Sequence, residues 1–354
     1  MSTRNTGAVP ILDVRNLSVT YATRDGPVQA ASDMSFALYP GENVGLVGES
    51  GCGKTTVIKS ILRLLPKNAT IDGGGILYKG KDLVKAGYED LRRIRWKEIA
   101  IISQSAMNAL DPVYRVSEQI VEAVTTHDKV GRGAARRRAE DLFRLVGLDR
   151  GRLSDFPHQF SGGMRQRAII AMSLALNPSV ILADEPTTAL DVIVQAQILR
   201  RIADLQKELG NSMLLVTHDI SVVAQTCAYV VVMYGGRVAE YGPIDRVFGE
   251  PCHPYTMGLR NAFPSIRGEW YELVSIPGFP PHLLDPGERC LFEQRCPFAQ
   301  DACRQTRPAV HQLHPGHYVG CHFADAADEM RRVSVLPGTW EAVETRLRKA
   351  GVAS

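Results

Sequence analysis

Eight consecutive residues, 48–55, carry the clearest chemistry in the sequence. They read Gly-Glu-Ser-Gly-Cys-Gly-Lys-Thr and match the phosphate-loop pattern G-x-x-x-x-G-K-[ST]. Glycines let the backbone curl so that successive N–H groups point at a β-phosphate, beside the positive end of the following helix. Lys54 can then bridge β- and γ-phosphate oxygens while the Thr55 hydroxyl ligates Mg²⁺. The residues expected to hold ATP here are Gly48, Glu49, Ser50, Gly51, Cys52, Gly53, Lys54, Thr55 and Thr56.

Two adjacent acids form a second candidate element. Asp184 and Glu185 follow the apolar run 180–183, which reads as a buried strand that delivers both at its carboxyl end. We expect Asp184 to hold Mg²⁺ through water and Glu185 to polarise an attacking water as general base. Two acids can also simply favour a helix N-terminus. The phosphate loop upstream favours the catalytic interpretation.

The elements around these residues alternate between strands and helices. The apolar run 44–47 leads into the phosphate loop, and apolar residues at helical spacing over 57–65 follow it. Strand-like runs at 180–183, 213–217 and 229–234 are separated by helical patterns. This alternation predicts a largely parallel α/β sheet.

Two further segments flank that sheet in the sequence. Alternating apolar residues over 17–21 and an apolar run over 34–38 predict strands on either side of a turn around Gly26. From 116 to 148 the pattern is helical. Its Arg-rich stretch 132–138 is interpreted as the solvated start of a helix, because apolar residues follow it at helical spacing.

The bulk composition is that of an ordinary globular protein. The chain has 354 residues, 45% of them hydrophobic and 22% charged, which favours two domains or one large domain with an appendage. A net charge of +3 is too small to argue for nucleic acid as a partner. No run approaches the roughly 18 apolar residues of a membrane span, and the N-terminus lacks a signal-peptide pattern. We therefore expect a cytoplasmic chain that meets a membrane only through a partner.

A third motif precedes another helical pattern. Residues 160–167 read Phe-Ser-Gly-Gly-Met-Arg-Gln-Arg. Alone, Ser-Gly-Gly at a helix start is only an N-cap. Beside the phosphate loop and the acid pair, however, this segment resembles the signature motif of the ABC-type ATPases. The motif residues expected to act are Ser161, Gly162, Gly163 and Gln166.

The remaining motifs of that family follow in the expected order. The resemblance implies that Tyr21 stacks on adenine and that Gln104, the Q-loop glutamine, senses Mg²⁺ and the transporter domain. It further implies that Asp191 is the D-loop aspartate and that His218 contacts the γ-phosphate. The catalytic residues are then Glu185, His218 and Gln104, and the magnesium ligands are Thr55, Gln104 and Asp184.

The same resemblance implies an architecture and an assembly. The fold is an α/β P-loop core with an antiparallel β subdomain and a helical subdomain. In the family, the signature helix of one subunit points its N-terminus at the nucleotide held by the other, so ATP joins two subunits head to tail. A helix N-terminus adds hydrogen-bond donors to the γ-phosphate. Ser161, Gly162, Gly163, Gln166 and Asp191 are thus expected to act in trans.

The composition changes after Glu250, where prolines and cysteines accumulate. Residues 251–259 resemble the segment that opens the C-terminal extension of the oligopeptide/dipeptide/nickel importer ATPases. Residues 106–112 resemble a segment of that subfamily near the groove where a permease docks. The expected division is an ATPase domain over 1–250, with its helical subdomain at about 105–176, and an extension over 251–354.

The extension contains four cysteines spaced C-x5-C-x6-C-x17-C, namely Cys290, Cys296, Cys303 and Cys321. Four thiolates suit a [4Fe–4S] cluster or zinc, although zinc favours tighter C-x2-C pairs. Seven cysteines in a chain without a signal peptide argue against disulfides. A similar pattern in peptide-importer ATPases is associated with a [4Fe–4S] cluster, so we expect that cluster, with zinc or unligated thiols as alternatives. His317 and His322 flank Cys321 and are expected to be surface residues.

The leading hypothesis is an ATPase subunit that powers an inner-membrane importer of peptides or similar solutes from the cytoplasmic face. The resemblance implies two permease subunits, a second ATPase subunit, identical or a sister, and an extracytoplasmic solute-binding protein. The alternative is a soluble ABC ATPase that serves an enzyme or cluster-assembly complex. A DNA-repair or translation ATPase is disfavoured, because those usually carry two ATPase units or a long coiled-coil insert. Nickel, opines and oligosaccharides stay open as cargo, since this subunit does not touch cargo.

Overall fold

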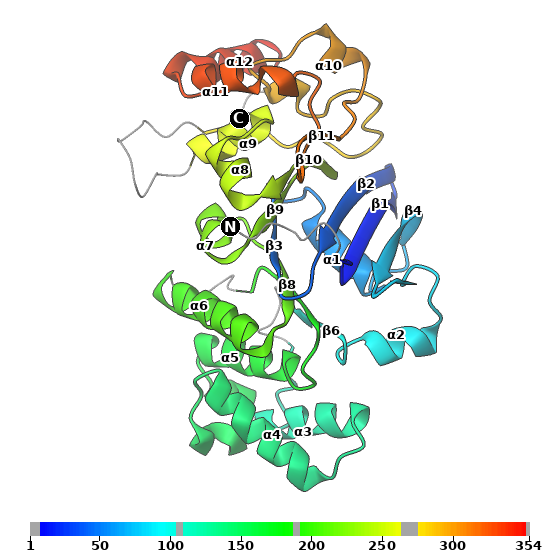
Figure 1. Cartoon of the computed structure of the whole chain (residues 1–354), viewed down its shortest axis with the longest axis vertical. Helices are drawn as coiled ribbons and strands as arrows, with labels where there is room; N and C mark the ends of the chain where they lie inside the picture. Colours follow the sequence, from blue (N-terminus) through cyan, green and yellow to red (C-terminus); the bar gives the residue numbers. More distant parts are fainter. Residues whose placement is uncertain (1–7, 104–108, 187–191, 263–274, 352–354) are drawn as a thin grey trace.

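The computed structural model describes residues 8–103, 109–186, 192–262 and 275–351. The candidate residues Gln104 and Asp191 lie outside these ranges. The molecule is elongated, with a group of helices at one end, two sheets in the middle and the C-terminal extension at the other end (Figure 1).

An eight-stranded sheet forms the centre, and its five core strands are parallel. The strands are β3 (Asn43–Val47), β6 (Ile99–Ile102), β7 (Val180–Asp184), β8 (Ser212–Val216), β9 (Tyr229–Tyr234), β10 (Arg237–Pro243), β11 (His311–His314) and β12 (His317–Val319). Their order across the sheet is β11-β12-β10-β9-β3-β8-β7-β6. Every residue of β3, β7, β8 and β9 is buried, as apolar parallel strands covered on both faces require. The predicted parallel α/β sheet is confirmed.

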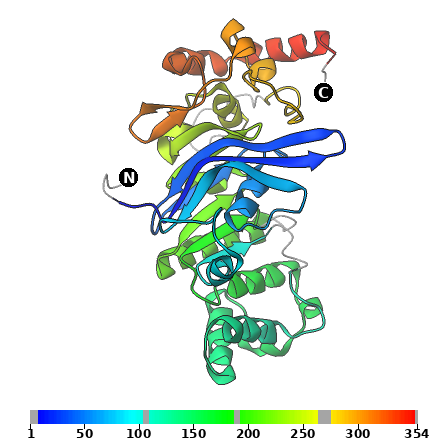
Figure 2. The same ribbon diagram turned by 90° about the vertical axis from the view of Figure 1, so that its right-hand side faces the viewer.

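A second sheet is antiparallel and has the order β2-β1-β4-β5. Its strands are β1 (Leu12–Thr23), β2 (Gly26–Leu38), β4 (Ala69–Tyr78) and β5 (Lys81–Asp82). The two long strands β1 and β2 run across the core in Figure 2. Thr23 pairs with Gly26, so the hairpin turn occupies residues 24–25, slightly before the turn that we expected.

The helical end of the molecule contains α3 (Val116–His127), α4 (Arg132–Leu145) and α5 (Gly162–Ser173). The Arg-rich stretch does begin a helix, α4, as predicted. Ala135, Ala139, Leu142 and Phe143 of α4 are buried, whereas Arg132 is exposed. The apolar face of α4 therefore packs inward and its guanidinium groups lie mostly on the outer side.

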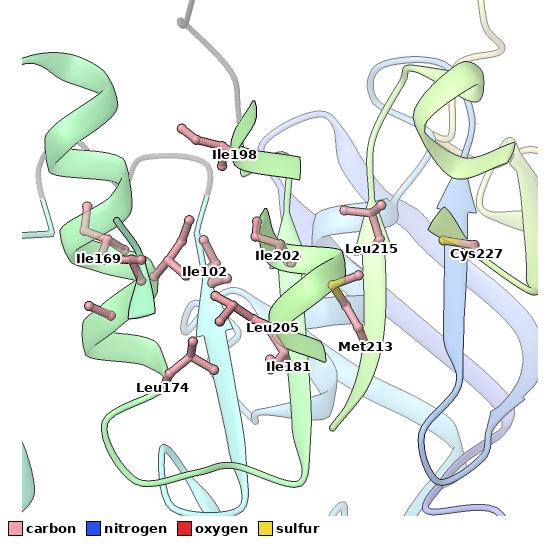
Figure 3. Packing of buried hydrophobic residues seen from close by; sticks show 14 of the residues in the cluster. Ile102, Ile169, Leu174, Ile181, Ile198, Ile202, Leu205, Met213, Leu215 and Cys227 are labelled. Atoms are coloured by element: carbon pink, nitrogen blue, oxygen red, sulfur yellow. The ribbon is translucent and has the colours of Figure 1, made fainter. Parts of the chain in front are cut away.

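Helices α5 and α6 (Val192–Leu209) pack against the strands β6, β7 and β8. Figure 3 shows this layer from close by. Its buried side chains include Ile102, Ile169, Leu174, Ile181, Ile198, Ile202, Leu205, Met213 and Leu215. Close packing of this kind resists small displacements, so the ends of these strands form a rigid base for functional residues.

Eight further α-helices complete the described part of the chain. Helix α1 (Lys54–Ile61) follows β3, and its buried Val57, Ile58 and Ile61 share one core with β1 and β2. The remaining helices are α2 (Tyr88–Ile94), α7 (Ile220–Thr226), α8 (Ile244–Gly249), α9 (Pro254–Asn261), α10 (Asp301–Gln305), α11 (Ala327–Ser334) and α12 (Pro337–Lys349). Across the described ranges, we find no helix with both the length and the apolar character to cross a bilayer.

The extension is joined to the core sheet, because β12 pairs with β10 and β11 pairs with β12. Glu240 on β10 is fully buried, and its carboxylate accepts hydrogen bonds from Cys252 N at 2.8 Å and His253 N at 2.9 Å. His317 Nε2 lies 2.8 Å from the same carboxylate. A sheet that continues from the ATPase core into the extension makes the two parts one packed unit.

His317 corrects one expectation from the sequence. We expected a surface histidine, but its side chain is 1% exposed. The reason is that β12 adds to the edge of the central sheet and turns His317 toward Glu240. With Cys252 these two residues form a compact group of possible metal ligands. Both carboxylate oxygens of Glu240 are already used as hydrogen-bond acceptors, so a structural anchor explains the group.

Candidate nucleotide-binding site

Three neighbouring strands bring the candidate residues together. β3, β8 and β7 are adjacent in the sheet and parallel. The phosphate loop follows β3, the segment with His218 follows β8, and Asp184 with Glu185 ends β7. Because parallel strands end at the same edge, all three segments meet at one edge of the sheet, where α/β proteins place their ligands.

Two glycines of the phosphate loop have no room for a side chain. Gly48 has φ 155°, and a Cβ added there would lie 2.3 Å from the carbonyl oxygen of Met233. Gly53 has φ 102°, and its Cβ would lie 2.0 Å from the carbonyl oxygen of Ala30. Sterics and backbone conformation thus both require glycine at these positions.

Lys54 lies inside the curl of the loop. Its ammonium group donates to the carbonyl oxygens of Gly48, at 2.8 Å, and Glu49, at 2.9 Å. The side chain is almost fully buried, so the loop and its cation form one closed unit. A bound phosphate would offer this ammonium stronger acceptors than the two neutral carbonyls.

Thr55 and Asp184, two of the predicted magnesium ligands, lie in contact. Thr55 Oγ1 donates to Asp184 Oδ1 at 3.3 Å, and Asp184 is 4% exposed. Burial raises the pKa of Asp184, while the hydrogen bond from Thr55 opposes that change. A buried carboxylate beside a hydroxyl is a suitable ligand pair for a hard cation such as Mg²⁺.

Glu185 and His218 face each other across the gap between β7 and β8. His218 Nδ1 lies 3.7 Å from Glu185 Oε1. Glu185 adopts a left-handed backbone with φ 45°, which is uncommon for a residue other than glycine and concentrates at functional sites. Asp219 caps α7 through Ser221 N at 2.9 Å and so fixes the turn that carries His218. The structure thus brings the two residues together; their roles as water-polarising base and γ-phosphate contact stay predictions.

Tyr21 lies beside the phosphate loop. Its hydroxyl is 3.2 Å from Thr56 Oγ1, so β1 brings an aromatic ring to the start of α1. Stacking of this ring on adenine stays a prediction.

Ser161 begins α5, as the motif predicted. Its hydroxyl accepts from Met164 N at 3.4 Å, and the residue is exposed. A Cβ at Gly163 would lie 2.8 Å from Val194 Cγ1 of α6, so this glycine permits close packing of the two helices. Gln166 is buried, and no hydrogen-bond partner of its Nε2 is found in the described part of the chain. Figures 1 and 2 place α5 with the helical end, whereas α1 lies beside the antiparallel sheet.

Two residues of the extension contact the phosphate loop and were not predicted from the sequence. The hydroxyl of Tyr255 accepts from Glu49 N at 3.0 Å. Arg295 binds both carboxylate oxygens of Glu49, at 2.7 and 3.0 Å. Arg295 stands 246 residues from Glu49 in the chain, and no periodicity or motif links them.

The structure also gathers the four cysteines of the extension, Cys290, Cys296, Cys303 and Cys321, around one small cavity. Cys296 and Cys303 are buried, and the other two are partly buried. Burial raises the pKa of Cys290 to about 11 and that of Cys321 to about 12. The ring of Phe292 lines the cavity as well. Among the described residues, all seven cysteines of the sequence are present as free thiols.

Comparisons with known proteins show which family this chain resembles. Residues 31–188 match the ABC transporter family, and residues 239–303 match the C-terminal region of oligopeptide/dipeptide transporters. A probable peptide ABC transporter ATP-binding protein of Sinorhizobium fredii is 45% identical over 88% of this chain and 94% of its own length. The dipeptide transport ATP-binding protein of Bacillus subtilis is 44% identical over 90% of this chain and 96% of its own length. The oligopeptide transport ATP-binding protein of Escherichia coli is 40% identical over 91% of this chain and 98% of its own length.

Solved structures point the same way. A dimeric ATP-binding cassette in a post-hydrolysis state, bound to ADP and Pi, superposes with a TM-score of 0.60 at 27% identity, covering 66% of this chain and 98% of that one. The cbiO1 protein of Clostridium perfringens, part of an ABC transporter complex, superposes with a TM-score of 0.58 at 28% identity, covering 68% of this chain and 91% of that one.

Proposed function

The chain belongs to the ABC transporter ATPases, in their oligopeptide/dipeptide branch, and from this premise we propose that it powers an importer of peptides or similar solutes by hydrolysing ATP. One observation carries the proposal: Lys54, Thr55, Asp184, Glu185 and His218 meet at one edge of the parallel sheet. The relatives act, by name, in peptide, dipeptide and oligopeptide transport. Each of them is matched over nearly its whole length.

The residues divide the chemistry among them. The loop amides and Lys54 hold the β- and γ-phosphates. Thr55 and Asp184 would hold Mg²⁺, and a bound Mg²⁺ would offset negative charge on the phosphate oxygens. Glu185 takes up a proton from the attacking water, and His218 contacts the γ-phosphate beside it. Tyr21 would stack on the adenine, and Gln104 would sense Mg²⁺ and the transporter domain.

A second ATPase subunit completes the site. Ser161, Gly162 and Gly163 open α5 at the helical end of the molecule, away from the loop of the same chain. The amides at that helix start would meet the γ-phosphate held by another subunit that docks head to tail. The similarity to a cassette that was solved as a dimer supports this assembly. Gln166 and Asp191 would act across the same interface.

The relatives also support a membrane complex. We place the chain on the cytoplasmic face of the inner membrane, bound to two permease subunits, with an extracytoplasmic solute-binding protein delivering cargo. The cargo is proposed to be peptide because the relatives' names specify peptides. Nothing in the ATP site reads cargo chemistry.

The four cysteines are proposed to hold a [4Fe–4S] cluster. They line one buried cavity, and four thiolates satisfy such a cluster. Tetrahedral zinc, with Zn–S bonds of about 2.3 Å, would need its thiols close together. The spacing C-x5-C-x6-C-x17-C lacks the C-x2-C pairs that zinc sites favour. Analysis of iron, zinc and acid-labile sulfide in anaerobically purified protein separates the two, and loss of the iron from Cys303→Ser would assign the site.

Affinity purification from gently solubilised membranes of the host tests the importer. Recovery of two permeases, with or without a second ATPase, supports it. Recovery of soluble enzymes or scaffold proteins alone would reassign the chain to a soluble complex and leave its ATP chemistry intact.

A further inference from the structure

A buried ion pair connects the extension to the phosphate loop. Arg295 is 4% exposed and places its two terminal nitrogens on the two carboxylate oxygens of Glu49. This bidentate geometry is the strongest and most directional form of an arginine–carboxylate contact. Glu49 is the second residue of the loop that is expected to hold ATP.

The surroundings of Arg295 hold its guanidinium in one orientation. Arg295 Nε donates to Pro277 O at 2.9 Å, and its terminal nitrogens also reach Ile276 O and the Tyr234 hydroxyl, each at 3.3 Å. The guanidinium carbon lies 5.7 Å from the centre of the Tyr234 ring. Because every contact depends on the planar fork, a lysine at this position could satisfy only part of them.

Glu49 is held at each of its polar groups. Its carboxylate binds Arg295, its N–H donates to the Tyr255 hydroxyl, and its carbonyl accepts from Lys54 Nζ. Tyr255 belongs to α9 of the extension and is fully buried. Any shift of Glu49 therefore moves an acceptor of the lysine that is to meet the phosphates.

Arg295 lies within the loop that carries the four cysteines. Arg295 directly precedes Cys296, and Cys290 N donates to Cys303 O at 2.9 Å within the same loop. Phe292 follows Cys290 by two residues and lines the cysteine cavity. Its ring packs edge-on against the rings of Tyr234 and Tyr255, with ring centres 5.0 and 5.5 Å apart. The loop that carries the cysteines and the contacts to Glu49 are thus one packed unit.

We propose that Arg295 is a positioning residue that couples the four-cysteine loop to the phosphate loop and thereby sets the affinity for ATP. The inference rests on the proposed ATPase function and adds a regulatory role for the extension. A conformational change around the cysteines would move Arg295, release Glu49 and alter the acceptors of Lys54. The competing explanation is that the ion pair only stabilises the fold, as a buried pair can.

Nucleotide affinity separates these explanations. Binding of a non-hydrolysable ATP analogue with Mg²⁺ is titrated by calorimetry on the full chain and on Arg295→Lys, Glu49→Gln and the double variant. We expect each single variant to bind about tenfold more weakly, about 1.4 kcal/mol, and the double variant to bind no worse than either. Glu49→Gln keeps the shape of the side chain, so it remains informative if Arg295→Lys folds poorly.

Arg332→Gln provides the matched control, because Arg332 lies in the same extension and its pairing with Glu329 is between two exposed side chains of α11. Its affinity should stay within twofold of wild type. If Glu49→Gln and Arg295→Lys bind within twofold while their melting temperatures fall, the ion pair is only structural and the proposal is overturned. Failure of the wild-type chain to bind the analogue would instead overturn the ATPase function itself.

A second double-mutant cycle, which combines Cys296→Ser with Arg295→Lys, tests whether the cysteine loop acts through Arg295. Cys296→Ser should weaken binding in the wild-type background and have little further effect in the Arg295→Lys background. Equal losses in both backgrounds would show that the cysteine loop acts independently of Arg295, contrary to the proposal.

Discussion

Thr55 Oγ1 lies 3.3 Å from Asp184 Oδ1, although 129 residues separate them in the chain. The first residue opens α1 after β3, and the second ends β7. Their contact joins the phosphate loop to the acid pair and defines where Mg²⁺ is expected. It also leaves a carboxylate almost fully buried.

Asp184→Asn should stabilise the nucleotide-free chain and abolish magnesium-dependent hydrolysis. Burial raises the pKa of Asp184, so folding disfavours its charged form, and stability is lost as pH rises from the unfolded pKa through the folded one. At neutral pH the amide removes that penalty but cannot serve as an anionic ligand. Thermal unfolding and ATPase assays check both effects, with the exposed Asp204→Asn as control. A lower melting temperature, or turnover that persists, would contradict the assignment.

Glu185→Gln should lower ATP turnover about 10²–10⁴-fold, the range expected for loss of a general base. Binding should persist, because Lys54 and Thr55 are untouched, and ATP should then hold the subunits together as a dimer. Analytical ultracentrifugation with and without ATP measures this. Glu208→Gln, on the exposed side of α6, should behave as wild type. Unchanged turnover in Glu185→Gln would refute the proposed base.

Gly53→Ala should destabilise the chain more than Gly51→Ala does. Both residues have positive φ, which costs a non-glycine residue about 1–2 kcal/mol. Only at Gly53 does the new Cβ meet a backbone carbonyl, at 2.0 Å, whereas no atom lies within 4 Å of a Cβ at Gly51. Urea unfolding measures the free energy of unfolding of the two variants. An equal decrease in both would show that the neighbouring backbone shifts to accommodate the Cβ at residue 53 without cost.

His253→Asn should reduce the loss of stability in mild acid. Burial lowers the pKa of His253 from 6.5 to about 4, so the folded chain keeps this imidazole neutral while the unfolded chain protonates it. Stability therefore falls as pH decreases from 6.5 toward 4, by about 2 kcal/mol between pH 6.5 and 5. Asparagine can replace Nδ1 as the cap that accepts from Tyr255 N at 3.0 Å. Denaturant unfolding at pH 7 and pH 5 measures how far the free energy of unfolding falls in the wild type and in His253→Asn. An equal fall in both proteins would count against this account.

Much of the ATP site could be predicted because its signals are local. Glycines at 48, 51 and 53, the lysine at 54 and the acids at 184 and 185 each stand next to a short apolar run, and such runs predict strands. Parallel strands end at a common edge, so separate motifs could be expected to meet. Helix α4 was predicted for the same reason, since its apolar spacing is visible within one segment.

The extension shows where local signals end. The sequence predicted that four cysteines serve one site, and the structure brings them to one cavity. It did not predict that β12 joins the central sheet, and so His317 was expected at the surface although it is buried against Glu240. The pairing of two strands distant in the chain depends on the path between them, which periodicity does not report.

By itself, the sequence determined the motifs and the family: the phosphate loop, the two acids predicted to be catalytic, the serine of the signature motif and the resemblance that joins them. Only the tertiary structure decided that Arg295 and Tyr255 of the extension hold Glu49 of the phosphate loop. The physical reason is that a motif is a run of neighbouring residues whose spacing suits a ligand. A buried ion pair between residues 49 and 295 forms only after the sheet and the extension have packed, and no local sequence pattern predicts it.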